Sequence, residues 1–361
     1  MPNPHCTHHC RRWPAWAIVP ILLGGSAAAQ NAVRWQDPSP HTTRLVTVEA
    51  DYQVEVLDWG GNGRPLVLLA GAGHTAHVFD DFAQRLTAYG RVYGMTRRGY
   101  GASSAPSSGY SASRLGEDVV QVLNALELQQ PVLIGHSLAG RELSYVASAH
   151  PGRMAGAIYL DAAYRYAFDW PGARDNLLDL PPPPNPPPAI PQPSERDLAS
   201  FAAYRAWTTR VRGHTLPEAE LRQVRAATAT DGVGPARTPE HIRKQLEAGG
   251  EPFTRLTVPA LAIFASPHAL VSAATRDAGP RAAFEAFERF DEAMTERQAA
   301  AFERGVAGSR VVRLPHATHY LFLSHEAEVL GEIRAFLARL ALAMESGALR
   351  PGMALAVAVS P

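Results

Sequence analysis

The segment Pro131–Gly140, with the sequence PVLIGHSLAG, constrains the fold of this chain more than any other. Its apolar residues 132–134 predict a buried strand, and the run that begins at Leu138 predicts a helix. Ser137 therefore lies on the turn between strand and helix. Small residues on both sides let the chain bend tightly, so that the serine hydroxyl projects from the sheet at a helix N-terminus, where positive potential favours an oxyanion. The pattern is typical of a nucleophile elbow.

Apolar segments alternate with helical periodicity along most of the chain after Pro65. Strands are predicted over residues 66–69, 92–95, 132–134, 157–160, 260–264 and 311–314. Helices are predicted over residues 77–89, 112–126, 138–150, 282–304 and 326–343. Such alternation predicts an α/β fold, in which helices cover both faces of a mostly parallel central sheet. Residues 44–49 and 53–59 alternate apolar and polar side chains and predict an antiparallel pair at one edge of the sheet.

One interval interrupts this alternation. About a hundred residues separate the predicted strands 157–160 and 260–264, far more than a crossover connection requires. The interval contains a proline-rich stretch over 181–193, predicted to be extended, and helical patterns over 195–212, 218–226 and 240–248. We interpret it as an inserted helical cap. The predicted organisation is a core over 30–163 and 256–345, a cap over 164–255 and a C-terminal tail over 346–361.

The N-terminus is typical of an export signal. Arg11 and Arg12 precede an apolar stretch over residues 15–23, and the small residues Ala27–Ala29 follow it. Residues 1–29 are therefore predicted to be a signal peptide that is removed, which places the protein in the periplasm or outside the cell. The apolar stretch is too short to span a membrane comfortably, so no integral span is expected after removal.

Composition argues against several other classes of chemistry. The formal net charge is zero, which gives no electrostatic case for binding nucleic acid or an anionic membrane. Lys244 is the only lysine, which makes Schiff-base and Ser-Lys chemistry improbable. The predicted signal peptide contains a cluster of possible metal ligands and both cysteines of the chain: His5, Cys6, His8, His9 and Cys10. Neither a disulfide nor a metal site is therefore expected in the exported protein.

A catalytic serine needs a base and backbone donors. A serine hydroxyl is a poor nucleophile until a base removes its proton, and the base needs an acidic partner to orient it. The candidate base is His319, on the loop after the last predicted strand, where it can face Ser137 across the strand ends. His316 on the same loop is the alternative. The amides of Leu138 and Ala72 are the expected oxyanion donors, because the small residues around Ala72 let the main chain approach a ligand.

Four further side chains are candidates for the substrate pocket. His74 follows the predicted oxyanion loop, and it either reaches the pocket or makes an ordinary hydrogen bond at a helix start. Tyr164, Tyr166 and Phe168 recur at every second position, so in an extended segment they share one side. They form either an aromatic wall for an apolar acyl or alcohol group, or packing between cap and sheet.

Taken in order, the motifs of this chain resemble those of the α/β-hydrolase superfamily, specifically its capped serine esterase and hydrolase branch. The motifs are LLAGAG at 68–73, TRRGYGAS at 96–103, GHSLAG at 135–140 and HATHYLFLSHEAEV at 316–329. The resemblance covers roughly residues 66–343. It implies that Ser137 is the nucleophile, that His319 is the base and that the amides of Ala72 and Leu138 form the oxyanion hole, with no cofactor.

The catalytic acid is where the chain departs from the family pattern. The usual carboxylate after the seventh strand is missing, since that loop reads ASPHAL at 265–270 and the first carboxylate beyond it is Asp277. Asp161 directly follows the predicted strand 157–160, which is expected beside the elbow strand, and some members of the superfamily place their acid at this position. Asp161 is therefore the predicted acid, and Asp277 is the alternative.

These features predict an exported serine hydrolase that cleaves a small apolar carboxylic ester, or a related acyl bond, through an acyl-enzyme. Two alternatives remain. The pattern GxGxxA at 71–76, with Arg97 and Arg98 after the next strand, also fits an NADP-dependent reductase. A binding protein with the hydrolase fold but without catalysis is the other alternative. The sequence does not predict which substrate is cleaved, because the predicted cap determines substrate choice and its sequence contains no pattern that indicates one.

Overall fold

The computed structural model describes residues 35–170, 191–270, 272, 276–277 and 280–347. The predicted signal peptide at 1–29, most of the proline-rich stretch and nearly all of the C-terminal tail lie outside the described residues. The chain divides into two parts, Met1–Asp37 and Pro38–Pro361, and every helix and strand below belongs to the second part. No helix among the described residues is long and apolar enough to cross a membrane.

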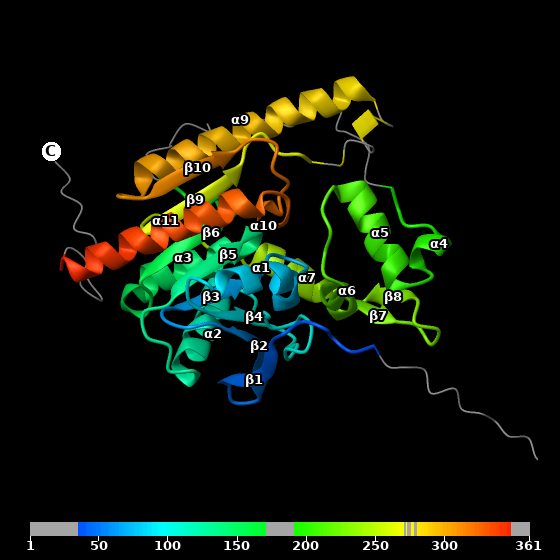
Figure 1. Ribbon diagram of the computed structural model, residues 1–361, viewed down its shortest axis with the longest axis horizontal. Helices are drawn as coiled ribbons and strands as arrows, with labels where there is room; N and C mark the ends of the chain where they lie inside the picture. The colour runs from blue at the N-terminus through cyan, green and yellow to red at the C-terminus, as the bar shows by residue number, and fades with distance from the viewer. Residues whose placement is uncertain (1–34, 171–190, 271, 273–275, 278–279, 348–361) are drawn as a thin grey trace, which may run out of the picture. The chain divides into compact units, whose positions relative to one another are not determined.

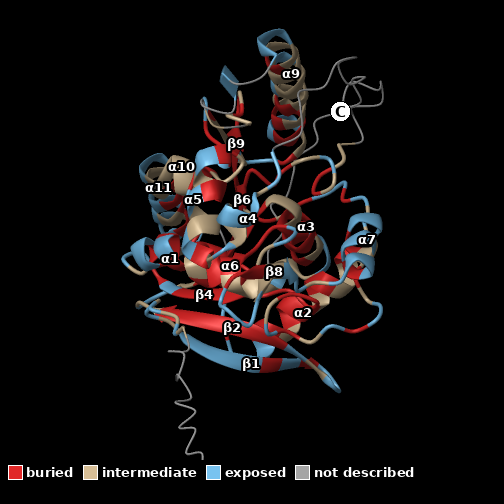
Figure 2. Cartoon of the chain, turned by 90° about the vertical axis from the view of Figure 1, so that its right-hand side faces the viewer, coloured by how far each residue is buried: buried red, intermediate tan, exposed pale blue. Residues whose placement is uncertain are grey.

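Eight strands form one sheet in the order β1-β2-β4-β3-β5-β6-β9-β10. Their bounds are β1 Thr42–Glu49, β2 Tyr52–Gly60, β3 Pro65–Leu69, β4 Arg91–Met95, β5 Val132–His136, β6 Gly156–Leu160, β9 Ala260–Ala265 and β10 Arg310–Leu314. β2 pairs antiparallel with β1 and β4, and all other neighbours are parallel. The mostly parallel sheet with an antiparallel pair at one edge is thereby confirmed. Figure 2 shows that edge, with β1 largely exposed and β2 buried.

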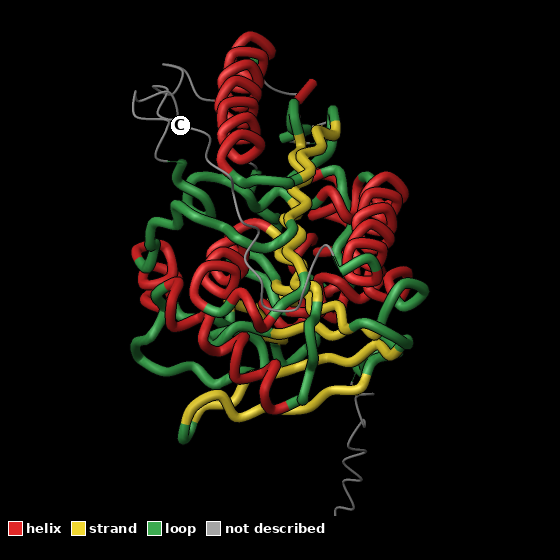
Figure 3. The backbone as a smooth tube through the Cα atoms, turned by 90° about the vertical axis from the view of Figure 1, so that its left-hand side faces the viewer, coloured by secondary structure: helices red, strands yellow, loops and turns green. Residues whose placement is uncertain are grey.

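Helices cover both faces of this sheet, as predicted. The elements packed on one face are α2 (Ala112–Ala125), α3 (Gly140–Ala149) and α9 (Arg281–Gly305). Those packed on the other are η1 (Ala76–Phe79), α1 (Asp80–Leu86), α10 (Leu321–Ser324) and α11 (Glu326–Glu345). Figure 3 shows the strands between the two helical layers, and in Figure 1 α9 runs along β9 and β10.

The apolar strand sequences follow from burial on both faces. In β5, Val132 and Ile134 pack into the core on the α1 and α11 side, whereas Leu133 packs into the core on the α2 and α3 side. Successive side chains of a strand point to opposite faces, so a strand covered twice must be apolar at every position. The parallel arrangement brings the carboxyl ends of β3, β5, β6, β9 and β10 to one edge of the sheet, where the loops with the candidate site residues begin.

The described part of the segment predicted as the cap contains α4 (Glu195–Leu198), α5 (Phe201–Arg212), α6 (Glu218–Val224), β7 (Arg225–Ala227), β8 (Val233–Ala236) and α7 (Glu240–Ala248). The single helix predicted over 195–212 is wrong, because Ser200 caps a new helix by accepting a hydrogen bond from the Ala203 amide. The helix predicted over 218–226 ends early because the chain turns into a hairpin. In that turn Asp231 has φ +58° and the Gly232 amide donates to Thr228 Oγ1.

Candidate active site

Ser137 lies at the turn from β5 into η2 (Ser137–Ala139), which leads directly into α3. Its φ is +52°, a left-handed conformation that non-glycine residues rarely adopt and that marks strain at functional sites. Small neighbours make the turn possible. A Cβ added to Gly135 would lie 2.7 Å from Leu143, and one added to Gly140 would lie 2.1 Å from the Ala162 carbonyl oxygen. The predicted elbow is therefore present in the backbone, and Ser137 is partly exposed at its tip.

His319 and Asp161 meet at the same edge of the sheet. His319 follows β10, and its Nδ1 lies 2.6 Å from Oδ2 of Asp161, which follows β6. Asp161 is fully buried and has φ +47°. Its Oδ1 accepts hydrogen bonds from the Ala265 amide at 3.0 Å and the Tyr164 hydroxyl at 2.6 Å. With Nδ1 bound to Asp161, Nε2 is the nitrogen of His319 left to take a proton from a serine.

The two alternatives to this pair lie elsewhere. Asp277 is exposed, and His319 Nδ1 already has Asp161 as its carboxylate partner. His316 is also exposed, in a turn where its φ is +60° and its amide donates to the Pro267 carbonyl. Among the residues predicted as base and acid, the structure brings His319 and Asp161 together.

A second histidine, His268, binds the same carboxylate and was given no role from the sequence. Its Nε2 lies 2.7 Å from Asp161 Oδ2, and its Nδ1 lies 2.6 Å from Oδ2 of Asp291 on α9. Burial alone would lower the pKa of His268, but the two carboxylates raise it to about 10, so the imidazole is charged. Burial would likewise raise the pKa of Asp161, but His268 and His319 lower it far below its usual range. Asp161 therefore remains ionised although it is buried.

The predicted oxyanion loop is the segment after β3, and it lies against Ser137. A Cβ added to Gly71 would lie 2.9 Å from Ser137 Cβ, so only glycine permits this approach. The buried Arg97 guanidinium fixes the loop by donating to the carbonyl of Gly71 at 3.2 Å and to that of Ala70 at 2.9 Å. The same guanidinium also donates to Glu142 on α3 at 2.6 Å. These contacts hold Gly71 against Ser137. The next residue is Ala72, whose amide is one of the two predicted oxyanion donors.

A family model described as alpha/beta hydrolase family matches residues 66–332, nearly three quarters of the chain. This chain belongs to the alpha/beta hydrolase family. The match begins at β3 and ends within α11, so it includes every element that positions the site.

Similar proteins carry several activities. A non-heme chloroperoxidase from Streptomyces lividans is 37% identical over 120 residues, which are 32% of this chain and 44% of that protein. An sn-1-specific diacylglycerol lipase from Xenopus laevis is 31% identical over 150 residues, 41% of this chain and 46% of that protein. The chain thus matches less than half the length of these curated relatives. The crystal structure of E-2-(acetamidomethylene)succinate hydrolase has a TM-score of 0.58 at 19% identity, covering 82% of this chain and 99% of that one, which shows a shared fold.

In this member of the alpha/beta hydrolase family, His74 joins the segment predicted as the cap to the predicted oxyanion loop. Its Nδ1 lies 2.8 Å from Oε1 of Glu220 on α6, and its Nε2 lies 2.6 Å from the Tyr320 hydroxyl. Glu220 is fully buried and also accepts hydrogen bonds from the amide and hydroxyl of Thr75. Predicted as a pocket residue, His74 thus joins α6 to the loop next to His319. The contact spans 146 residues of sequence, and no local pattern indicates it.

The aromatic segment after Asp161 is a turn, so the prediction of an extended segment is wrong. The amides of Ala167 and Phe168 both donate to the Tyr164 carbonyl, which coils the chain. Phe168 is 3% exposed and packs edge-on against Phe302 of α9, as expected for core packing. Burial raises the pKa of Tyr166, and its interaction with the Ser137 side chain offsets that rise only in part, so its hydroxyl stays protonated.

The arginines that suggested an NADP phosphate clamp are already engaged. Arg97 is 5% exposed and Arg98 is 2% exposed. Arg97 binds Glu142 and the loop carbonyls, whereas Arg98 forms a bidentate pair with Asp118 at 2.5 and 2.6 Å. Gly71 lies against Ser137, whereas a Cβ added to Gly73 would meet nothing within 4 Å. The sequence-based alternative of a reductase is therefore not supported by the site.

Proposed function

We propose that this protein is a serine hydrolase that cleaves a carboxylic ester, or a related acyl bond, through a Ser137-His319-Asp161 triad. The observation that carries the proposal is the 2.6 Å contact between His319 Nδ1 and the buried Asp161 carboxylate, at the strand edge where Ser137 stands on a left-handed turn. Acyl transfer requires a base oriented in this way and a serine on a strained turn at the same edge of the sheet.

The reaction begins with proton transfer from Ser137 Oγ to His319 Nε2 as Oγ attacks the substrate carbonyl carbon. Asp161 stabilises the imidazolium that forms, and it remains ionised because His268 and His319 lower its pKa. The carbonyl oxygen becomes an oxyanion that the amides of Leu138 and Ala72 receive, close to the start of η2. In this proposal the protonated Tyr166 hydroxyl, which interacts with the Ser137 side chain, orients Oγ before attack.

Collapse of the tetrahedral intermediate releases the alcohol, which takes its proton from His319. Water then attacks the acyl-Ser137 ester with His319 as base, and a second collapse returns the free serine and a carboxylic acid. No cofactor takes part in either half. We further propose that the enzyme is exported, because Arg11, Arg12 and the apolar stretch over 15–23 precede the small residues Ala27–Ala29.

A panel of p-nitrophenyl esters of increasing acyl length tests this function, with wild type, Ser137→Ala and Ser148→Ala compared. Ser148 is a matched control because it is an exposed serine of the same α3 helix region, and its hydroxyl donates only to the Arg255 carbonyl. Ser137→Ala should lose activity by about 10⁴-fold or more while remaining folded. Ser148→Ala should retain it.

Halide oxidation with peroxide provides a second arm, since one relative is named a chloroperoxidase. Halogenation without any ester cleavage, or full ester cleavage by Ser137→Ala, would contradict the proposed function. Loss of ester cleavage in Ser137→Ala alone would support it.

A further inference from the structure

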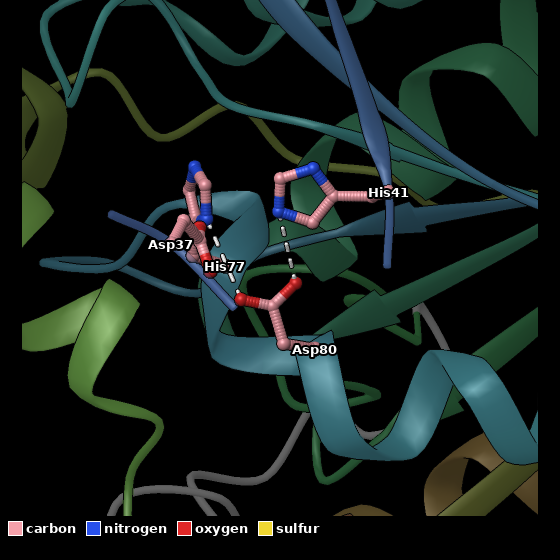
Figure 4. A group of neighbouring side chains, drawn as sticks. All are labelled: Asp37, His41, His77 and Asp80. Carbon is pink, nitrogen blue, oxygen red and sulfur yellow. Dashed lines mark ion pairs between the residues drawn. The ribbon is translucent and has the colours of Figure 1, made fainter. Parts of the chain in front are cut away.

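A group of buried histidine and carboxylate side chains lies outside the proposed catalytic site. His41 directly precedes β1, His77 is in η1 and Asp80 begins α1. Figure 4 shows the imidazoles of His41 and His77 directed at the Asp80 carboxylate. These side chains are 5%, 4% and 1% exposed, respectively. Asp37, also drawn there, belongs to the separate part Met1–Asp37.

The spacing of these side chains is that of ligands around an ion. His41 Nε2 lies 3.4 Å from Asp80 Oδ1, and His77 Nδ1 lies 3.4 Å from Asp80 Oδ2. Hydrogen bonds between nitrogen and oxygen usually span roughly 2.7–3.2 Å, so both distances are long for a direct bond. Two ligands at about 2.0–2.1 Å from a tetrahedral ion are about 3.4 Å apart. The possible ligand atoms of the group all lie within 4.8 Å of one another.

Each of the three side chains also has a further polar neighbour. Such second contacts are typical of metal ligands, because they fix the orientation and tautomer of each imidazole. Trp59 Nε1 donates to Asp80 Oδ1 at 3.1 Å. His41 Nδ1 lies 3.5 Å from Thr43 Oγ1, and His77 Nε2 lies 3.6 Å from Glu55 Oε1, so these two contacts are longer than usual hydrogen bonds. The partner of each histidine lies away from Asp80, so the other ring nitrogen faces the carboxylate.

The charge of the group also favours a cation. Asp80 Oδ2 is buried and receives no hydrogen bond from the described residues. Glu55 is a second buried carboxylate next to His77, and Thr96 Oγ1 donates to it at 2.7 Å. Burying two carboxylates is costly unless positive charge accompanies them, and a divalent ion between His41, His77 and Asp80 would supply it.

We propose that His41 Nε2, His77 Nδ1 and the Asp80 carboxylate bind one divalent transition-metal ion, with zinc as the best match for two imidazoles and one carboxylate. A water molecule or another ligand takes the remaining position. The ion fastens the start of the exposed edge strand β1 to η1 and α1, and its role is structural because the ligands are buried. No metal was expected from the sequence, because possible ligands are clustered along the chain only at residues 5–10, whereas His41, His77 and Asp80 come from separate segments.

Metal content and thermal stability test this site in the full chain, after removal of any affinity tag. All proteins carry Cys6→Ser and Cys10→Ser, so that the cysteines near the N-terminus do not bind metal. Wild type, His41→Gln, Asp80→Asn and the control Asp81→Asn are stripped with a chelator, and zinc is then added back. Asp81 is the exposed neighbour of Asp80 on α1 and is the matched control.

Wild type and Asp81→Asn should each take up one more zinc equivalent than the two ligand variants. Their melting temperature should rise by about 5 °C at a hundredfold excess of zinc over Kd. Cobalt should give the visible absorption of a low-symmetry nitrogen and oxygen site in the same two proteins only. Ester cleavage at 25 °C should be unchanged in His41→Gln, which keeps this test separate from that of the proposed function.

Equal zinc uptake in wild type and His41→Gln, or no zinc-dependent change in wild-type melting temperature, would overturn the metal site. If Asp80→Asn fails to fold, His41→Gln decides the question alone, because His41 lies outside the sheet at the start of the edge strand.

Discussion

His268 should affect the protonation of His319 and the rate of catalysis, although it does not contact the substrate. It shares Oδ2 of Asp161 with His319, at 2.7 and 2.6 Å, and the other ring nitrogen binds Asp291. The change His268→Gln keeps a hydrogen-bonding side chain but removes a positive charge, since the carboxylates raise the pKa of His268 to about 10 against the opposing effect of burial. The charge opposes formation of a second imidazolium at His319 during catalysis.

The size of this effect follows from the separation of the two rings. Their centroids are 6.4 Å apart, and two unit charges at that distance repel by about 2.6 kcal/mol at an effective dielectric constant of about 20. The His319 side chain is 40% exposed, so solvent screening reduces the repulsion, and about half of it should remain. That remainder corresponds to about one pH unit. Loss of the charge-assisted hydrogen bond to Asp161 should separately lower kcat/KM by about tenfold.

The assay is kcat/KM against pH for a p-nitrophenyl ester, with His268→Gln compared with wild type and His316→Asn. The acidic midpoint of His268→Gln should move up by about one pH unit, because the repelling charge is gone. His316 is the control, since it is an exposed histidine on the His319 loop. An unchanged midpoint and unchanged kcat/KM in His268→Gln, or a midpoint that moves down, would refute the reasoning. A merely structural role would lower activity at every pH without moving the midpoint.

Four further outcomes are expected. Asp161→Asn should lower kcat by roughly 10³ to 10⁴-fold, whereas Asp277→Asn should leave kcat near that of wild type. The reverse result would identify Asp277 as the catalytic acid. Tyr166→Phe should lower kcat/KM by about tenfold without changing the melting temperature, and an unchanged rate would remove its orienting role. Glu220→Gln should lower the melting temperature by several degrees and raise KM, as measured by calorimetry and ester kinetics, because an NH2 donor replaces one of the two buried acceptor oxygens of Glu220. The free energy of unfolding should fall as pH rises from 6.5 through about 10, because the raised pKa of His268 contributes stability that is fully present only below pH 6.5. Denaturant titrations at several pH values should show this fall in wild type and not in His268→Gln.

The parts predicted well from the sequence depend on local constraints. The elbow needs Gly135 and Gly140 because leucine and a carbonyl oxygen lie within 3 Å of any Cβ there, and such crowding is visible in a short motif. The strands were visible because both faces of the sheet are covered. The contact between Asp161 and His319 was predictable because Asp161 directly follows β6, the strand beside β5, and the ends of parallel strands meet at one edge.

The parts that were missed depend on contacts between distant segments. His268 stands in the loop where the family usually has a carboxylate, and only the fold shows that it binds Asp161 across 107 residues of sequence. The contact between Glu220 and His74 is of the same kind. Within the cap, the turn after Asp161 and the β7–β8 hairpin result from side-chain and backbone hydrogen bonds that compete with the helical or extended patterns read from the sequence.

Labelling with a fluorophosphonate probe tests the central claim most directly. The probe reacts only with a serine whose proton a neighbouring base removes, and peptide mapping by mass spectrometry identifies the modified residue. A single adduct on Ser137 in wild type, with much slower labelling in His319→Gln, is the predicted result. An unlabelled protein that still cleaves esters, or an adduct on a serine other than Ser137, would contradict the proposed triad.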